Sequence, residues 1–192
     1  MDAVSPAGHD EHRSLDLIRE AAKIAERPGK LPPGFVAALF SHASPEDVVA
    51  YRAEDLAKLA QGGYEFLQTR GEGEAKVKIV NPGAAGKDPL GRVTVIEIAN
   101  DDMPFLLDSV MGEISAHHLH VLMVAHPIFT VERDGKGKLT GWQKGREPGS
   151  ANKGAGRRES FIHLHVERIE ETQFKAIEAA LQSLFVELRV CV

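Results

Sequence analysis

The chain has 192 residues and a formal net charge of -5, with basic residues dispersed along its length. This length allows one full core or two small ones, and the apolar and charged fractions are those of an ordinary globular protein. Dispersed basic residues argue against a broad nucleic-acid surface, and no stretch approaches the roughly 20 apolar residues of a membrane-spanning helix. The start has no signal peptide, so we expect a cytoplasmic protein without nucleic-acid or membrane partners.

The first part of the chain, 1–74, is predicted to form a small helical unit. Helices are expected over 12–27, 33–42 and 44–60. Apolar residues three or four positions apart give the first of them one apolar stripe, formed by Leu15, Ile18, Ala22 and Ala25. The pair Gly62-Gly63 is expected to end the third helix.

From Ala75 onward the period changes to that of strands. Strands are predicted at 76–80, 92–98, 120–133 and 160–166, with a helix after the second and a helix after the last. Pro127 should interrupt the third strand, because proline cannot donate a ladder hydrogen bond. The last helix should pack through a narrow seam, formed by Phe174, Ile177, Leu181, Leu184 and Leu188.

This order of elements predicts an α+β fold. The ferredoxin-like fold is a four-stranded, mainly antiparallel sheet with two helices on one face. In this chain the first strand is expected to occupy the edge position that the last strand usually fills. Strand 92–98 is apolar on both faces, so the N-terminal helices or another subunit should cover the second face. We therefore expect a helical segment at 1–74 and an α+β domain at 75–192. The uncapped ending "ELRVCV" suggests a chain cut from something longer.

The stretch "NDDMPFLLDSVMGEI" joins an apolar strand to an apolar helix. Asp101 or Asp102 could cap that helix, with Pro104 in its first turn. Alternatively the turn offers amides and carboxylates to a small ligand, through Asn100, Asp101, Asp102, Met103, Pro104 and Phe105. Two adjacent acids on one loop cannot easily flank a reacting bond, so we assign no catalytic residue.

Histidines form a second candidate site. His163 and His165 lie two apart on a strand and therefore point to one side, and His126 ends a neighbouring strand. Three neutral imidazoles would suit zinc, but no carboxylate or cysteine lies at a recognisable ligand spacing. The sequence favours hydrogen bonding over metal binding at these positions.

The glycine-rich stretch 134–159 is strongly basic, through Lys136, Lys138, Lys144, Arg146, Lys153, Arg157 and Arg158. It could hold an anion, although its composition favours a solvated loop. The stretch "NPGAAGKDP" only imitates a phosphate loop, because Asn81 replaces its first glycine and Asp88 the Ser/Thr ligand of magnesium. No dinucleotide turn precedes a helix either, so we expect no cofactor in this chain.

Several segments match a known family. "EIANDDMPFLLDSVMGEISAHHLHVLMVAHPIFTVERDGKGKL" and "RRESFIHLHVERI" resemble the N-terminal region of the large bacterial NAD-dependent glutamate dehydrogenases, as do "HASPEDVVAYRAEDLAKLA" and "AKVKIVNP" upstream. The resemblance implies a very long multidomain polypeptide, with ACT-like domains for regulation and assembly preceding an NAD-dependent core beyond residue 192.

ACT domains carry a D-x-P-G-L-L-like turn between the first strand and helix, beside which small effectors bind. The residues that fit that turn are Asp102, Met103, Pro104, Leu106 and Leu107, but Phe105 stands where the glycine would be. A bulky side chain there should fill the space an effector needs, which favours packing against the core or a partner domain.

Three hypotheses follow. The first is a non-catalytic regulatory and assembly fragment of a glutamate dehydrogenase, the parent oxidatively deaminating glutamate to 2-oxoglutarate and ammonia. Its partners would be other domains or subunits, and we expect a homo-oligomer. The second is an amino-acid-binding module that uses the turn Asn100–Phe105. The third is a small metal-dependent hydrolase built on His126, His163 and His165.

Overall fold

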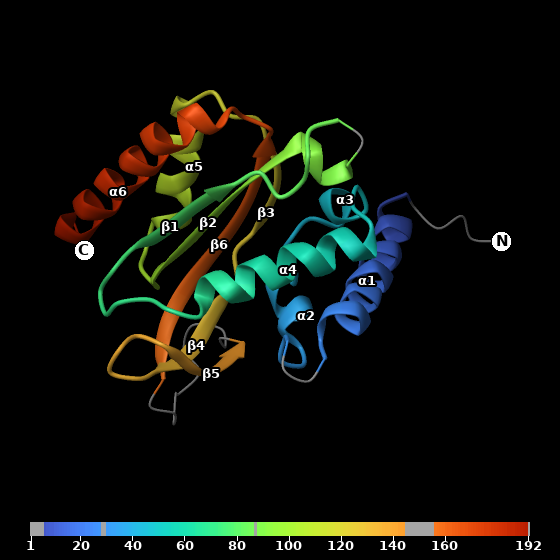
Figure 1. Cartoon of the computed structure of the whole chain (residues 1–192), viewed down its shortest axis with the longest axis horizontal. Coiled ribbons are helices and arrows are strands. Elements are labelled where there is room, and N and C mark those ends of the chain that lie inside the picture. Colours follow the sequence, from blue (N-terminus) through green and yellow to red (C-terminus); the bar gives the residue numbers. More distant parts are fainter. Residues whose placement is uncertain (1–5, 28–29, 87, 145–155, 192) are drawn as a thin grey trace.

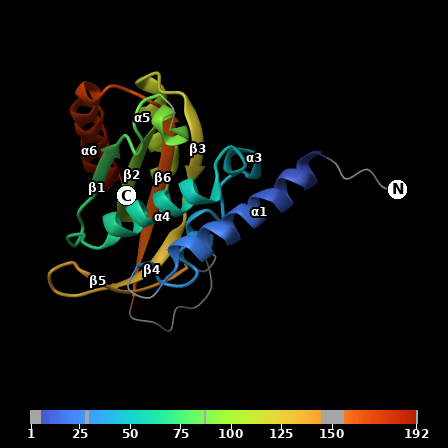
Figure 2. The same cartoon turned by 45° about the vertical axis from the view of Figure 1, so that its right-hand side comes forward.

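The computed structural model describes residues 6–27, 30–86, 88–144 and 156–191, and they form three layers. One antiparallel sheet lies in the middle, with helices α5 and α6 on one face and helices α1 to α4 on the other (Figures 1 and 2). The predicted α+β class with an antiparallel sheet is therefore confirmed.

The N-terminal layer contains four helices, α1 (Pro6–Ala25), α2 (Phe35–Leu39), α3 (Pro45–Val48) and α4 (Ala53–Leu67). The single helix predicted at 44–60 is wrong, because Arg52 is extended and separates α3 from α4. The predicted stop at Gly62-Gly63 is also wrong. A Cβ on Gly63 would lie 3.2 Å from the Phe161 ring, so this glycine lets α4 approach the sheet. None of the described helices is both long enough and apolar enough to span a membrane.

The sheet contains six strands within the described residues, so the four-stranded detail is not confirmed. They are β1 (Lys76–Val80), β2 (Val93–Asp101), β3 (Val121–Ala125), β4 (Ile128–Arg133), β5 (Leu139–Lys144) and β6 (Arg157–Glu167). Their order is β1-β2-β6-β4-β5, and β3 also pairs with β6. The leading strand β1 pairs with β2 at the edge, as predicted.

The two additional strands have local causes. Pro127 divides the predicted strand 120–133 into β3 and β4, which pair with successive halves of β6. Strand β5 lies within the stretch predicted as a solvated loop, so that prediction is wrong for Leu139–Lys144. Leu139 is buried, and the ring of Trp142 lies 5.4 Å from that of Phe129, which anchors β5 to the core. Residues 145–155 of the loop lie outside the described residues.

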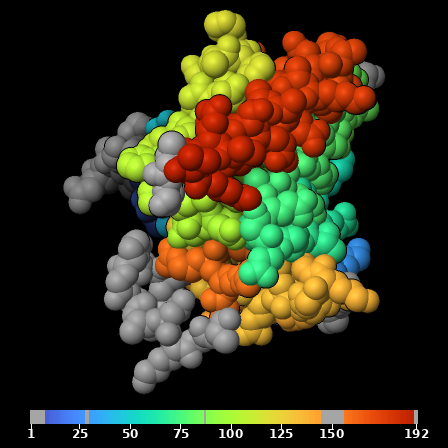
Figure 3. All heavy atoms as spheres, turned by 90° about the vertical axis from the view of Figure 1, so that its left-hand side faces the viewer, coloured from blue at the N-terminus to red at the C-terminus, as the bar shows by residue number. Residues whose placement is uncertain are grey.

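Helices α5 (Leu106–Ala116) and α6 (Phe174–Cys191) cover one face of the sheet with an apolar core. Ile177 and Leu181 of the predicted seam are fully buried, and Phe185 joins them. Two short 3-10 helices, Pro89–Arg92 and Glu171–Gln173, precede β2 and α6. Figure 3 shows α6 lying across this side of the molecule, with its last turns beside the segment that begins α5.

The N-terminal helices cover the second face, which confirms one of the two predicted alternatives. Val36 and Leu56 of the helices share one buried cluster with Val95 and Phe129 of the sheet. In α1 the buried stripe runs through Ile18, Ala21 and Ala25, whereas Leu15 is exposed. The predicted domain boundary lies between residues 74 and 75, and residues on both sides of it contribute to this common core. A division of the chain into two domains stays a prediction.

Candidate functional site

The turn from Asn100 to Phe105 leaves the end of β2 and begins α5. Asn100 is fully buried, whereas the Phe105 side chain is 72% exposed. Phe105 occupies the N-cap position in the left-handed region, at φ 62°, and makes no side-chain cap hydrogen bond. The predicted aspartate cap is therefore wrong, because three residues separate Asp102 from the first residue of α5. The expectation that Phe105 packs into the core is wrong for the described chain.

Three arginines from different elements hold the polar residues of this turn. Arg189 Nη2 of α6 donates to Asn100 Oδ1 at 3.1 Å. Arg70 Nη2, between α4 and β1, donates to Asp101 Oδ1 at 2.6 Å.

Arg158 supplies the third contact. Its Nε donates to Asp102 Oδ2 at 2.9 Å, and its carbonyl accepts from the Asp102 amide at 3.1 Å. Strand β6, on which Arg158 lies, is thus joined to the turn through both side chain and backbone. Contacts from α6, from β6 and from the segment after α4 therefore hold the turn in its conformation.

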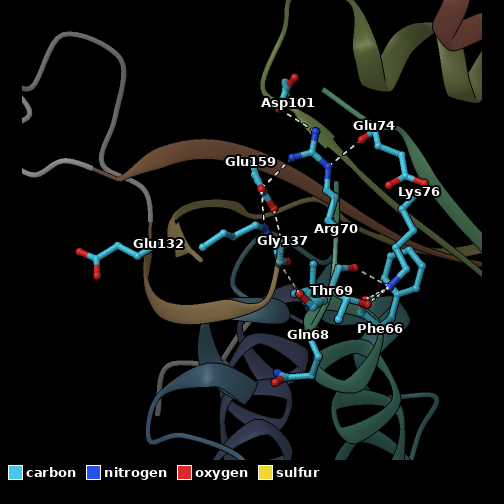
Figure 4. Close-up of polar contacts among 12 residues, drawn as sticks. Phe66, Gln68, Thr69, Arg70, Glu74, Lys76, Asp101, Glu132, Gly137 and Glu159 are labelled. Carbon is cyan, nitrogen blue, oxygen red and sulfur yellow. Dashed lines mark hydrogen bonds and ion pairs between the residues drawn. The ribbon is translucent and has the colours of Figure 1, made fainter. Parts of the chain in front are cut away.

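Arg70 belongs to a buried charged cluster that Figure 4 shows in close-up. Its Nη1 donates to Glu159 Oε1 at 2.7 Å, and its Nε donates to the Glu74 carbonyl at 2.7 Å. Arg133 donates to both Glu159 oxygens at 2.8 Å. Each of these charges therefore has a partner, which burial requires because an isolated buried ion is very costly.

Lys76 extends this region to the end of α4. Its ammonium donates to the carbonyls of Phe66 and Thr69, and it lies 4.6 Å from the centre of the Phe66 ring. Carbonyls at a helix C-terminus attract cations, so Lys76 stabilises this end of the helix. Burial lowers the pKa of Lys76.

A cavity of about 680 Å³ opens beside the charged cluster. Its lining carries both signs of charge in equal number, through Arg70, Arg133, Lys136 and Arg157 against Glu72, Glu132, Asp134 and Glu159. A balanced lining gives no net attraction for an anion, so it does not favour the anion site suggested by the basic stretch. Arg146 and Lys153 of that stretch lie outside the described residues.

The three histidines do not converge. His126 bonds through Nε2 to Ser160, whose side chain points to the opposite sheet face from that of His163. Burial lowers the pKa of His126. No group of three histidine, cysteine, aspartate or glutamate residues among the described ones could hold a metal ion. The metal centre required by the hydrolase hypothesis therefore has no support in this part of the chain.

His163 and His165 belong instead to a buried polar chain under α4. The hydroxyl of Tyr51 lies 2.7 Å from His165 Nδ1, and His165 Nε2 lies 2.9 Å from His163 Nε2. His163 Nδ1 faces Glu97 Oε1 at 3.3 Å, and Lys78 Nζ donates to Glu97 Oε2 at 3.0 Å. We call these five residues the relay chain.

Burial changes the proton affinities along the relay chain. Burial and the nearby His163 hold the pKa of His165 well below its ordinary value, and burial raises the pKa of the Tyr51 phenol. Burial would raise the pKa of Glu97, but His163 and Lys78 outweigh it and hold that pKa below its ordinary value. At neutral pH the relay chain therefore contains an ionised carboxylate, a neutral His165 and a neutral phenol.

Sequence reasoning did not identify Arg70, Glu159, Tyr51 or Glu97 as parts of these sites. One signal was available, because Glu97 interrupts the apolar run "RVTVIEI" and a charge in a buried strand needs a partner. The alternation "HLH" on another predicted strand offered that partner. No comparable local signal links Arg70 to Glu159.

Comparisons with known proteins place the chain in a family. A family model described as "Glutamate dehydrogenase, ACT1 domain" matches residues 35–181. The chain belongs to this family. The ACT1 chain is 30% identical over 188 residues to the NAD-specific glutamate dehydrogenase of Halomonas elongata, a match that covers 95% of the chain and 11% of that protein.

The NAD-specific glutamate dehydrogenase of Pseudomonas aeruginosa gives a second match. It is 25% identical over 159 residues, which cover 82% of the ACT1 chain and 10% of that protein. The ACT1 chain thus spans about a tenth of the length of these relatives. No solved structure matches it significantly.

Proposed function

We propose that this ACT1 chain is a non-catalytic regulatory and assembly part of an NAD-dependent glutamate dehydrogenase. The parent would oxidatively deaminate glutamate to 2-oxoglutarate and ammonia in the cytoplasm, with NAD bound elsewhere in the polypeptide. The family match over residues 35–181 supports this, as do two relatives named as NAD-specific glutamate dehydrogenases, of which the matches cover only 11% and 10%.

The observation that carries the assembly role is the exposed Phe105. Its side chain is 72% exposed, and its left-handed backbone is one that non-glycine residues rarely adopt. A large aromatic side chain that is exposed to solvent, on a turn held by three arginines, is suited to packing against another domain or subunit. A homo-oligomer in which this turn contacts a neighbour would explain the position.

The experiment is made on the full-length parent enzyme. Phe105→Ala should reduce the assembled fraction measured by light scattering, because it removes the aromatic contact. Leu15→Ala is the matched control, since Leu15 is also an exposed apolar residue but lies on α1. Equal assembly of both variants and the unaltered enzyme would contradict the assembly role. The 192-residue chain by itself should reduce no NAD in the presence of glutamate.

A second candidate function is amino-acid binding at the turn Asn100–Phe105. The outward position of Phe105 favours it, because the ring does not fill the space beside the turn. Asp101 is 42% exposed, so its carboxylate is open to the ammonium group of an amino acid, whereas its partner Arg70 is buried and already paired. The first and second candidates differ in whether Phe105 meets protein or ligand.

Thermal-shift titration with a panel of amino acids tests the second candidate. Binding should raise the melting temperature in a saturable way, and Asp101→Asn should weaken that response. Asp108→Asn is the matched control, because Asp108 is exposed on α5 beyond the turn. A flat response across the panel would rule against an effector at this turn.

A further inference from the structure

A groove runs along the outer edge of β5, where that strand meets α2 (Figure 1). Its first hollow has a volume of about 500 Å³ and is lined by Pro32, Pro33, Ala37, Trp142, Gln143 and Lys144. Successive side chains of a strand point to opposite faces of the sheet. A hollow lined by three consecutive residues of β5 therefore lies along the edge of that strand.

A second hollow continues the groove toward α4. It has a volume of about 610 Å³, adjoins the first hollow at Pro32 and Pro33, and has Tyr64 in its wall. The Phe35 ring packs between the two walls, with its centre 5.0 Å from that of Tyr64 and 5.3 Å from that of Trp142. Trp142 is only half-buried and Pro33 is exposed, so both offer apolar surface. We call the two hollows together the Trp142 groove.

The backbone beside this groove belongs to an edge strand. Strand β5 is the last in the sheet order and pairs with β4. At its start, Thr69 bridges to Lys138, and the Gln68 carbonyl accepts from the Leu139 amide. Beyond Leu139, no strand among the described residues pairs with this edge. An open edge can take up an extended segment through backbone hydrogen bonds, while side chains of that segment enter adjacent hollows.

The charges that line the Trp142 groove are mainly positive. Among the described residues they come from Arg27, Lys30 and Lys144, against Glu26 alone. The Glu26 carboxylate already accepts from two backbone amides at the start of α2, at 2.8 and 2.9 Å. The groove therefore presents a positive rim, which attracts a partner of negative charge.

We propose that the Trp142 groove binds an extended acidic peptide segment. The backbone of the segment adds to the edge of β5, and one of its apolar side chains packs beside Trp142 and Pro33. Its carboxylates face the positive rim. The groove shares no residue with the turn at Phe105, so this partner site is separate from the surface proposed for assembly.

The charges also decide against two alternatives. A second copy of the chain, paired edge to edge, would bring two positive rims together, which is repulsive. The opposite edge of the sheet, at β1, lacks such a rim, because its cavity is lined by Lys58 and Lys78 against Glu65 and Glu97. An acidic segment is therefore expected at β5 and not at β1.

Fluorescence titration of the 192-residue chain tests the site, because Trp142 is its one tryptophan. The probe is an end-blocked peptide of alternating glutamate and leucine, which places its leucines on one side when extended. It should shift the Trp142 emission to shorter wavelength in a saturable way, since a leucine displaces water from the ring. Raising the salt from about 0.05 M to about 0.5 M should weaken binding severalfold, because salt screens exposed charges. Absence of a saturable shift overturns the proposal.

Three variants at exposed positions locate the binding. Lys144→Glu should weaken peptide binding about tenfold, because it places a like charge at the rim. Ala37→Glu should weaken it similarly from the α2 side of the groove. Lys175→Glu is the matched control, since Lys175 is also an exposed lysine but lies on α6, and the affinity should not change. Equal losses in Lys144→Glu and Lys175→Glu would reflect only the overall charge of the chain and would overturn the proposal.

Other occupants of the groove give different results. Amide hydrogen exchange at residues 141–144 should slow when the peptide binds, and unchanged exchange would overturn strand addition. Equal affinity for a peptide with lysine in place of glutamate, or for acetyl-leucine amide alone, would contradict an acidic segment. A concentration-dependent dimer whose formation changes the Trp142 emission would assign the groove to a second copy instead.

Discussion

The two faces of the sheet are stabilised in different ways, although the same strands supply both. Toward α5 and α6, the central residues of β2 and β6 are apolar, as at Ile98 and Leu164, and the polar Thr94, Asn100 and Ser160 lie nearer the strand ends. Toward α1 to α4, the intervening positions include Glu97, Glu159 and His163, all fully buried. One face depends mainly on apolar burial, and the other depends on apolar burial together with the pairing of buried polar groups.

This difference has a physical consequence. Apolar packing tolerates changes of shape and loses stability in proportion to the volume removed. A buried charged group depends on its particular partners, and deleting one of them leaves the others uncompensated. The polar face should therefore be more sensitive to single substitutions and more sensitive to pH.

The largest effect is expected for Glu159→Ala. Glu159 pairs with both Arg70 and Arg133, so its loss leaves two arginines without their shared counter-charge and should cost about 5 kcal/mol of unfolding free energy. Urea denaturation measures it. Glu132→Ala on the neighbouring strand is the matched control, because Glu132 is exposed and should change stability by less than about 0.5 kcal/mol.

A triple variant sharpens this test. Replacing Arg70, Glu159 and Arg133 together by Met, Leu and Met removes the buried charges as a set and should recover most of the loss. Asp101 also loses its partner Arg70, but it is 42% exposed and water can solvate its charge. If the triple variant were as unstable as Glu159→Ala, the loss would come from packing and the comparison between the faces would fail.

On the apolar face, replacement of an equally buried residue should cost less unfolding free energy. Phe185→Ala removes a fully buried aromatic ring from α6 and should cost about 3 kcal/mol. Val186→Ala next to it is the control, because Val186 is exposed and its truncation should be nearly neutral. Urea denaturation at pH 8 and pH 6 should give the same loss for Phe185→Ala, since no titrating group of the relay chain contacts this face.

The polar face should also lose stability in acid. The pKa of His165 lies well below its ordinary value when folded, so the unfolded chain binds a proton near pH 6.5 that folded His165 does not. The stability contributed by neutral His165 is therefore present above about pH 6.5 and is lost as pH falls below it. His165→Phe should reduce the slope of stability against pH by up to about 1.4 kcal/mol per pH unit.

Melts in urea between pH 7.5 and pH 5 measure that slope. His120→Gln is the matched control, because the His120 side chain is exposed at the surface, and it should leave the slope unchanged. An unaltered slope in His165→Phe would show that the acid sensitivity of the chain arises elsewhere.

Sequence patterns predicted the apolar face better than the polar one. The spacing of Ile177 and Leu181 identified the buried side of α6, and Pro127 identified the break between β3 and β4, because both signals are local. The pairing of Arg70 with Glu159 joins residues 89 positions apart, and no local pattern encodes it.

The same limit explains the errors at glycines and in the basic stretch. Gly63 looked like a helix stop because its reason for being glycine is contact with Phe161, far along the chain. The composition around Leu139 and Trp142 predicted a solvated loop, yet Leu139 is buried and the Trp142 ring packs against Phe129 of β4. At the turn, the motif located the residues but not the outward direction of Phe105.

The smallest expected effect concerns that residue. Phe105→Ala should cost less than about 0.5 kcal/mol, because little of its side chain is buried. Phe105→Gly should stabilise the chain by about 1 kcal/mol, since glycine adopts a φ of 62° without steric cost. Thermal melts of the 192-residue chain measure both changes. If Phe105→Ala instead cost 3 kcal/mol, the ring would be packed in solution and the open turn would be wrong. If glycine is the more stable residue here, the phenylalanine is retained at a cost in stability, which is expected where the exposed ring is needed for contact with a neighbouring domain or subunit.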